Sequence, residues 1–167
     1  AGLFDSGMSF INMTWDLLPT YRKVAKEFFG VDGAAIASVA TLAGRHTGGW
    51  VQYSFTAPNG LWVGQTYYLH WRHTKDKVFL KERAYPWLSE ITTGLVNLLE
   101  EKDGKLYLPL SSSPEIYNNS MQAWLPPNSN YDLSLMQWAF DALAEMADAL
   151  EKKEDAAKWR GLRAKLG

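Results

Sequence analysis

The sequence contains no cysteine, and only three of its 167 residues are histidines. Without cysteine the chain has neither disulfide bonds nor thiolate metal sites. His70 and His73 are spaced to share one face of a helix, but no HExxH pattern accompanies them. A GxSxG nucleophile elbow and a P-loop are also absent. The sequence therefore implies no metal centre and no organic cofactor.

No excess of charge of one sign and no long apolar run is present. Lysine and arginine number 17 against 18 acidic residues, without a large basic block, so a nucleic-acid surface has little support. No apolar stretch reaches the roughly 18 residues that a membrane-spanning helix needs. With 47% hydrophobic and 21% charged residues, the composition is typical of a packed globular protein. We expect residues 1–167 to form a single domain or part of a larger one.

Aromatic residues, in contrast, are abundant. Eight Trp, eight Tyr and seven Phe make up 14% of the chain. Large rings are the usual material of a hydrophobic core, but flat rings also stack on sugar faces in carbohydrate sites. Composition leaves both interpretations open.

Apolar residues recur at helical spacing in several segments, and breaker residues separate these segments. The predicted helices are 15–29, 61–72, a short helix capped by Thr74 or Asp76, a helix with Pro86 in its first turn, a helix that starts at Tyr131 or Asp132 and extends to Leu150, and 156–166. Residues 1–14 show no clear period and are predicted to be a connector. The result is an all-α fold of helical hairpins.

The connections are alternately short and long. Short turns are expected at 73–76 and 151–155, and long irregular loops at 30–60 and 102–130. If the helices alternate in direction, both long loops lie at the same end of the helical layer. Such an end is where binding sites are usually built.

The second long loop contains a carboxylate in a nearly neutral setting. Glycoside hydrolysis needs two carboxyl groups, one of them held protonated as a general acid. Glu115 follows Pro114 in the stretch SSSPEIYNN, and no cationic residue occurs between Lys105 and Lys152. Desolvation in an aromatic pocket would raise the pKa of such a glutamate. From local sequence alone, a solvated loop glutamate is the alternative.

Asp132 is the second carboxylate of interest. As the residue that opens the strongest predicted helix, it most simply caps that helix by accepting bonds from backbone NH groups. A role as a base or in contact with a sugar is a secondary possibility. Arg45, Asn118 and Asn128 are further side chains that could bond sugar hydroxyls.

Three segments together resemble the catalytic domain of glycoside hydrolase family 95, which comprises α-L-fucosidases and α-L-galactosidases. They are YLHWRHTKDKVFLKERAYPWL, then PLSSSPE, then NYDLSLMQWAFDALAEMADAL, and the resemblance covers about residues 20–152. The HxxDKxFLxxRAYPxL portion is shared by many six-hairpin glycosidases and so implies part of an (α/α)6 barrel. The SSSPE segment followed by a helix that opens in YD is more specific to the family.

The resemblance implies a function for the loop. Glu115 matches the general acid of an inverting hydrolysis, and Asp132 matches an aspartate that we interpret as shaping the same site. The family carries an NxN motif on an earlier barrel segment and its general base near the end of the barrel, and neither has a counterpart at such a place in this chain. We therefore expect a central fragment of a larger catalytic domain, inactive on its own, whose partners are an oligosaccharide or glycan and the rest of the parent chain. A secreted or periplasmic location is also implied.

The identity of the sugar is left open, because GRHTGGWVQYSFTAPNG at 44–60 replaces a loop that bears His and Asp in typical fucosidases. Trp50, Tyr53, Asn119 and Trp124 are the predicted sugar-facing residues. One alternative is a carbohydrate-binding or helical scaffold domain without catalysis. Another is a helical interaction domain whose aromatic residues only fill the core.

Overall fold

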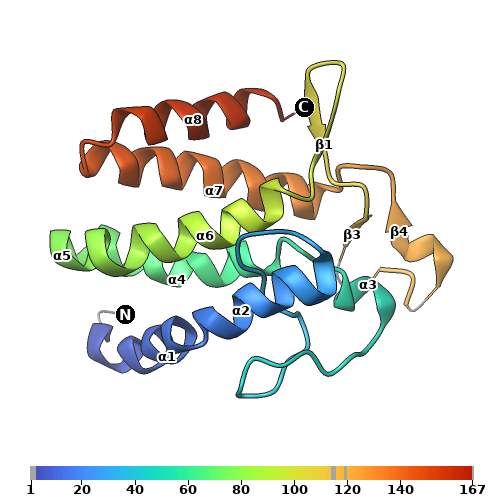
Figure 1. Cartoon of the computed structure of the whole chain (residues 1–167), viewed down its shortest axis with the longest axis horizontal. Helices are drawn as coiled ribbons and strands as arrows, with labels where there is room; N and C mark the ends of the chain where they lie inside the picture. The colour runs from blue at the N-terminus through green and yellow to red at the C-terminus, as the bar shows by residue number, and fades with distance from the viewer. Residues whose placement is uncertain (1–2, 114–115, 119, 167) are drawn as a thin grey trace.

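The computed structural model describes residues 3–113, 116–118 and 120–166, and the fold is mostly helical (Figure 1). Long helices lie side by side, with contacts of α4 to α1, α6 and α7, and of α7 to α6 and α8. Among the described residues, strands occur only between α6 and α7. The arrangement confirms the prediction of helical hairpins that form part of an α/α barrel. No described helix combines the length and apolarity that a bilayer crossing demands.

The N-terminal segment is a helix, α1 (Phe4–Asp16), where the sequence was predicted to form a connector. Only Ile11 and Thr14 of this helix are fully buried, whereas Phe10 and Met13 are 41% and 38% exposed. Apolar residues on the exposed side obscured the helical period, which explains the wrong prediction.

The predicted helix at 15–29 is confirmed, although it consists of two pieces. Helix α2 (Leu18–Val24) has a proline in its first turn and continues into a π-helical turn, η1 (Ala25–Phe29). Gly30 ends the helix with a left-handed φ of 74°, as its place in the sequence predicted.

The next hairpin is formed by four elements: α4 (Asn59–Thr74), α5 (Lys77–Phe79), the π-helical turn η2 (Leu80–Ala84) and α6 (Tyr85–Val96). Asp76 caps α5, since its carboxylate accepts from the backbone NH groups of Val78 at 2.8 Å and Phe79 at 3.0 Å. The elements from α5 to α6 follow one another without a break. The wider turn of η2 precedes Pro86, and in an ordinary helix interior the ring of a proline clashes with the carbonyl four residues earlier.

Glycines allow α4 and α6 to pack closely. A Cβ atom on Gly60 would lie 2.7 Å from Cγ2 of Ile91, and one on Gly64 would lie 2.5 Å from Cδ1 of Leu88. The two glycines are one helical turn apart and face the same neighbour. The branched side chains of α6 therefore fill the space that larger residues on α4 would occupy.

A buried polar group joins α1 to this hairpin. Tyr67 donates its hydroxyl to the carbonyl of Ile11 at 2.9 Å and lies 2.9 Å from the Thr14 hydroxyl. The indole of Trp87 stacks on Tyr67, with 4.4 Å between ring centroids, and donates to the Thr14 carbonyl at 3.2 Å. Burial raises the pKa of Tyr67 well above its usual range, so this phenol stays protonated.

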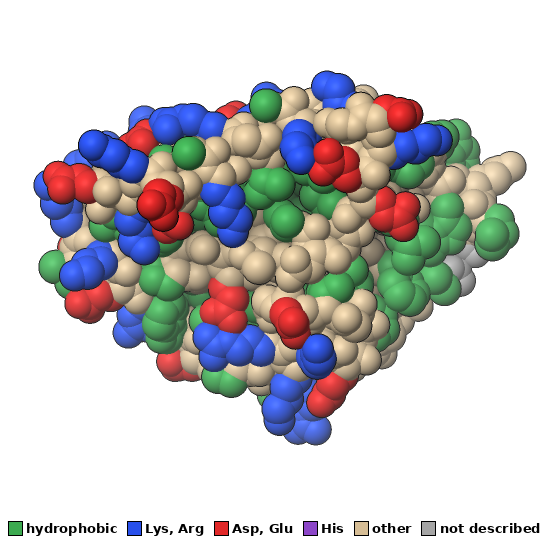
Figure 2. All heavy atoms as spheres, turned by 45° about the horizontal axis from the view of Figure 1, so that its top comes forward, with side chains coloured by type: hydrophobic (Ala, Val, Ile, Leu, Met, Phe, Trp, Pro, Cys, Tyr) green, Lys and Arg blue, Asp and Glu red, His purple; other side chains and the backbone are tan. Residues whose placement is uncertain are grey.

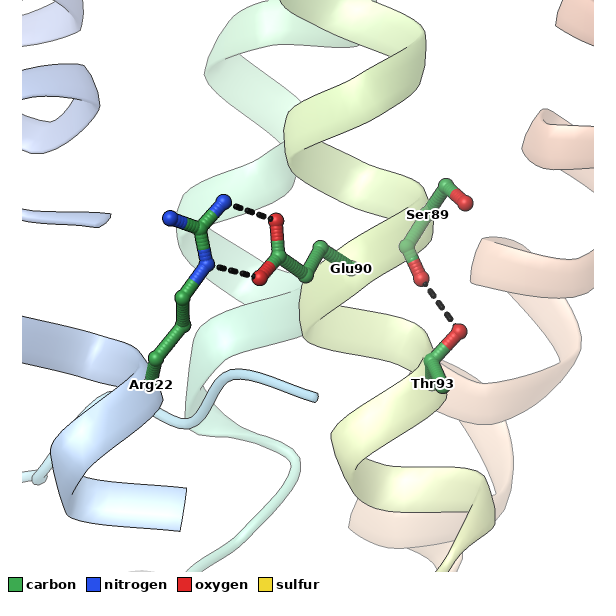
Figure 3. A network of polar contacts seen from close by, with 4 residues as sticks. All are labelled: Arg22, Ser89, Glu90 and Thr93. Carbon is green, nitrogen blue, oxygen red and sulfur yellow. Dashed lines mark hydrogen bonds and ion pairs between the residues drawn. The ribbon is translucent and has the colours of Figure 1, made fainter. Parts of the chain in front are cut away.

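At the surface, an ion pair connects α2 to α6. Figure 3 shows the guanidinium of Arg22 facing the carboxylate of Glu90, with the Nη2–Oε2 distance at 2.8 Å. On the neighbouring side of α6, Thr93 donates its hydroxyl to the Ser89 carbonyl at 2.8 Å.

The C-terminal hairpin consists of α7 (Asn130–Ala149) and α8 (Lys153–Ala164). The first of the two predicted helices began one or two residues later and the second three residues later, and the short turn between them is confirmed. The rings of Phe140 and Trp159 are fully buried and stacked, with centroids 6.2 Å apart. Many aromatic residues therefore belong to the core, in line with the simpler interpretation of the composition.

The connection between α6 and α7 is not the plain loop that was predicted. It contains β1 (Glu100–Lys102), β2 (Lys105–Tyr107), β3 (Ser111–Ser112), the 3-10 turn η3 (Met121–Ala123) and β4 (Trp124–Leu125), paired as β1–β2 and β3–β4, both antiparallel. Asp103 and Gly104 have φ values of 52° and 76°, which suits the tight turn of a hairpin. The Leu106 NH donates to the Lys165 carbonyl at 3.0 Å and holds this hairpin against the end of α8.

Both long connections lie at the same end of the helices, on the right in Figure 1, as predicted. The first contains the short helix α3 (Val51–Ser54). Charged side chains cover much of the helical surface in Figure 2, whereas hydrophobic side chains gather at the loop end. Exposed apolar side chains of the second connection are Leu110, Ile116, Tyr117 and Met121.

Candidate functional site

The two long connections contact each other through a buried glutamine. Gln52 on α3 is 2% exposed, and its side-chain amide donates to the Asn118 carbonyl. The hydroxyl of Ser112 donates to the Gln52 carbonyl at 3.3 Å. Helix α3 is therefore packed against the segment that surrounds the SSSPE motif. The sequence gave no sign of this role for Gln52, because a lone glutamine in a loop carries no pattern.

The aromatic residues predicted to face a sugar lie on these two connections. Trp50 is 42% exposed and stacks on Tyr53, with ring centroids 5.8 Å apart and planes tilted by 26°. Trp124 on β4 is half-buried and packs edge-to-face with Phe55, with ring centroids 6.3 Å apart. The structure brings Tyr53 and Trp124 to the same region, and contact with a sugar stays a prediction for all three residues.

Glu115, the predicted acid, lies outside the described residues, as do Pro114 and Asn119. The described flanks are residues 111–113 on one side and 116–118 on the other. Tyr117 and Asn118 have left-handed φ values of 59° and 52°. A backbone turned in this way at two successive non-glycine residues is uncommon and is a feature of functional loops.

Asp132 does not cap α7, which corrects the simplest prediction for this residue. The N-cap is Ser129, whose hydroxyl accepts from the Asp132 NH at 3.2 Å. The Asp132 side chain is 1% exposed, and its Oδ2 atom accepts from the hydroxyls of Ser129, at 2.9 Å, and Ser111. The carboxylate is thus buried between the start of α7 and strand β3. Direct contact of Asp132 with a sugar stays a prediction.

Burial raises the pKa of the Asp132 carboxyl above its usual value, because desolvation disfavours the charged form. Hydrogen bonds from Ser111, Ser129 and nearby backbone NH groups oppose part of this shift. The spacing of Ser129 and Asp132, S-x-x-D, is the sequence pattern of a capping box and could have identified Ser129 as the cap.

The side-chain amide of Asn128 forms hydrogen bonds with backbone groups at both of its ends. Its Oδ1 atom accepts from the Leu108 NH at 2.8 Å, and its Nδ2 group donates to the Leu106 carbonyl at 3.0 Å. The Asn128 side chain therefore continues the pairing of strand β2, instead of facing a ligand as the sequence suggested.

Arg45, another candidate, lines an open cavity of about 650 Å³ beside η1. The lining residues are Thr20, Lys23, Val24, Glu27, Phe28, Ala43, Arg45 and His46. His46 stacks on Phe28, with ring centroids 4.6 Å apart.

A smaller apolar cavity of about 110 Å³ lies at the loop end, lined by Phe29, Phe55, Ala57, Leu98, Leu108, Pro109 and Leu110. Nowhere in the described part of the chain do three His, Asp or Glu side chains gather as a metal site requires.

Comparison with known proteins gives two matches. The family model described as "Glycosyl hydrolase family 95 catalytic domain" matches residues 1–167. The chain is also 26% identical over 140 residues to "Alpha-L-fucosidase 2" of Arabidopsis thaliana, an alignment that covers 80% of this chain and 17% of that protein. The matched part is therefore a small share of this relative's length.

Proposed function

The chain belongs to glycosyl hydrolase family 95, and from this premise we propose that it contributes to an inverting glycosidase acting on an α-L-fucosyl or α-L-galactosyl bond. Its membership makes it a glycoside hydrolase-like domain. The family match over the whole chain carries the proposal, and the relative named as an α-L-fucosidase supports the class of sugar.

In the proposed reaction, Glu115 is the general acid. It donates its proton to the glycosidic oxygen as the bond to the anomeric carbon breaks, and water attacks that carbon from the opposite face. The lack of any cationic residue between Lys105 and Lys152 supports this assignment, because no neighbour along the chain favours the ionised carboxylate. Inversion needs a base across the sugar, which we assign to the remainder of the parent chain.

The sugar would lie against the aromatic residues of the two long connections. Trp50 and Tyr53 provide a stacked, partly exposed pair on one connection, and Trp124 lies on the other. Flat rings can cover the apolar face of a sugar while amides such as that of Asn119 bond its hydroxyls. Asp132 supports the same site from beneath strand β3.

The substitution Glu115→Gln in the complete gene product tests the acid. We expect kcat on unactivated oligosaccharides to fall by about 100-fold or more, the usual contribution of a general acid. Glycosyl fluorides should be hydrolysed almost as fast as by the wild type, because fluoride leaves without protonation. Glu100→Gln, an exposed change at the same end of the molecule, is the matched control. Near-normal turnover of oligosaccharides by Glu115→Gln would overturn the assignment.

A carbohydrate-binding domain without catalysis is the second candidate, and the exposed Trp50–Tyr53 stack favours it because a sugar platform needs no carboxylate. In this case the complete gene product binds the oligosaccharide, Glu115→Gln leaves the affinity unchanged, and no hydrolysis occurs in the wild type. Binding calorimetry and product analysis on the wild type and on Glu115→Gln distinguish the glycosidase from the non-catalytic binding domain.

A further inference from the structure

The hydrogen bonds at the start of α7 differ from those of an ordinary capping box. In a capping box, the side chain at the third helical position bonds the backbone NH of the N-cap residue. Asp132 occupies the third position here, but the Ser129 NH donates to Oγ of Ser111 at 2.8 Å. The Ser111 hydroxyl in turn donates to Oδ2 of Asp132. A hydroxyl from strand β3 therefore bridges the N-cap and the carboxylate.

Strand β3 is also held by three further contacts. The Ser129 hydroxyl lies 2.8 Å from the Ser112 carbonyl, so its one proton is shared between this carbonyl and Oδ2 of Asp132. The Ser112 hydroxyl donates to the Gln52 carbonyl on α3. On its other edge, β3 pairs with Trp124–Leu125 of β4. A strand of two residues is thus tied to α3 of the first long connection, to the start of α7 and to a neighbouring strand.

The cost of this arrangement is the burial of a carboxylate. Asp132 and Ser111 are each 1% exposed, and in the described part of the chain no Lys or Arg forms an ion pair with Asp132. A buried charge without a cation destabilises a fold unless hydrogen bonds compensate it. The helix already has a neutral cap in Ser129, so capping does not require the buried carboxylate. The carboxylate is better explained by the strand it fixes, because departures from local stability rules cluster at functional sites.

We propose that Asp132 is a positioning residue that, through the hydroxyls of Ser111 and Ser129, fixes strand β3, which directly precedes the segment of the proposed acid in the sequence. Glu115 follows Ser112 by three residues, so the carboxyl group and the fixed strand belong to one short segment. This inference rests on the proposed function, since it takes Glu115 as the acid. In this role Asp132 acts through Ser111 and Ser129, and direct contact with the sugar is the competing prediction that the test below distinguishes.

The test compares two leaving groups in the complete gene product. In Asp132→Asn, the side chain keeps its size and one acceptor oxygen but loses its charge. We expect kcat on an unactivated oligosaccharide to fall about 30- to 100-fold, because a misplacement of the acid by an ångström has effects of this size. The glycosyl fluoride, which needs no proton, should lose less than about threefold, and KM should stay within a factor of about two for both.

Ser111→Ala is the second variant, because it removes the bridging hydroxyl and leaves the carboxylate intact. The same difference between the two substrates is expected, and the double variant should be no worse than the poorer single variant, since the two residues act as one unit. Asp141→Asn is the matched control on the same helix: Asp141 pairs with Arg163 at 3.2 Å on the surface, and both activities should be unchanged. If Asp132→Asn does not fold, Ser111→Ala decides the question.

Three results would overturn the inference. Equal losses on both substrates indicate general damage, a raised KM with normal kcat indicates direct sugar binding by Asp132, and unchanged kinetics indicate no role.

Glu115→Gln, measured in parallel, separates this inference from the proposed function. If Glu115→Gln does not distinguish the substrates, the acid assignment fails. If Glu115→Gln distinguishes the two substrates but the Asp132 and Ser111 variants do not, only the positioning role fails.

Discussion

At Gly94, the backbone of helix α6 is crossed by the chain that leaves η1. A Cβ atom on Gly94 would lie 2.2 Å from the carbonyl oxygen of Ala34, far inside van der Waals contact. The Ala34 NH donates to the Glu90 carbonyl at 3.2 Å, so the two backbones are also joined by a hydrogen bond. A backbone oxygen cannot move aside as the end of a flexible side chain can.

Gly94→Ala is therefore expected to lower the free energy of unfolding by about 3 kcal/mol, the upper part of the range for overpacked cores. Gly161→Ala on α8 is the matched control, because a Cβ atom there meets nothing within 4 Å. At this position alanine should stabilise the protein by about 0.5–1 kcal/mol through its better helix propensity. Urea denaturation of both variants measures the two changes. If the two variants were equally stable, the close approach of the Ala34 backbone to Gly94 would be contradicted.

Single residues also show what the sequence could not predict at the site. The family resemblance singled out Glu115 and Asp132, and Asp76 could be recognised as a cap from its place before a helix. The bridge from Ser129 through Ser111 to Asp132 joins residues 18 to 21 positions apart, and no local pattern signals it. Gln52 is joined to Asn118 across 66 positions, which is likewise visible only in three dimensions.

At the scale of elements, helical periodicity was sufficient wherever a helix buries a continuous stripe. Helix α7 has such a stripe, with Met136, Phe140, Leu143 and Met146 fully buried, and its bounds were predicted to within two residues. Helix α1 buries too little for the same method. The strands between α6 and α7 are two or three residues long, shorter than any alternation of apolar and polar residues can reveal.

The contact between α2 and α6 leads to a prediction at this scale. Arg22 and Glu90 are partly exposed, with 54% and 26% of their side chains accessible, so solvent screens most of their attraction. A double-mutant cycle with Arg22→Gln and Glu90→Gln should give a coupling energy of about 0.5 kcal/mol that weakens in 1 M salt. The pairing of Arg160 with Asp148, which joins α7 to α8, offers a comparison of similar exposure. A coupling several times larger, insensitive to salt, would show that the pair is shielded from solvent.

At the scale of the whole molecule, the helices form a support, and the two long connections form the loop end (Figure 1), where we propose that the sugar binds. Short turns close the opposite end, where α4 passes to α5 and α7 to α8. Apolar side chains are exposed at the loop end. Among them Ile116, Tyr117 and Met121 lie close to the proposed acid in the sequence. Such a surface suits an oligosaccharide or a further part of the same protein.

The chain of residues 1–167 should therefore behave as half of an active site. An inverting glycosidase needs both an acid and a base on opposite faces of the sugar, and of these two we assign only the acid to this chain. Produced alone, it should hydrolyse oligosaccharides at less than about a thousandth of the rate of the complete gene product, since the loss of a catalytic partner has effects of about this size. Circular dichroism should confirm its helices, and quenching of the fluorescence of Trp50 and Trp124 should report whether it still binds sugar. Turnover within about tenfold of the complete protein would place both catalytic carboxylates within this chain, and Asp132 would then be the first residue to test as the base.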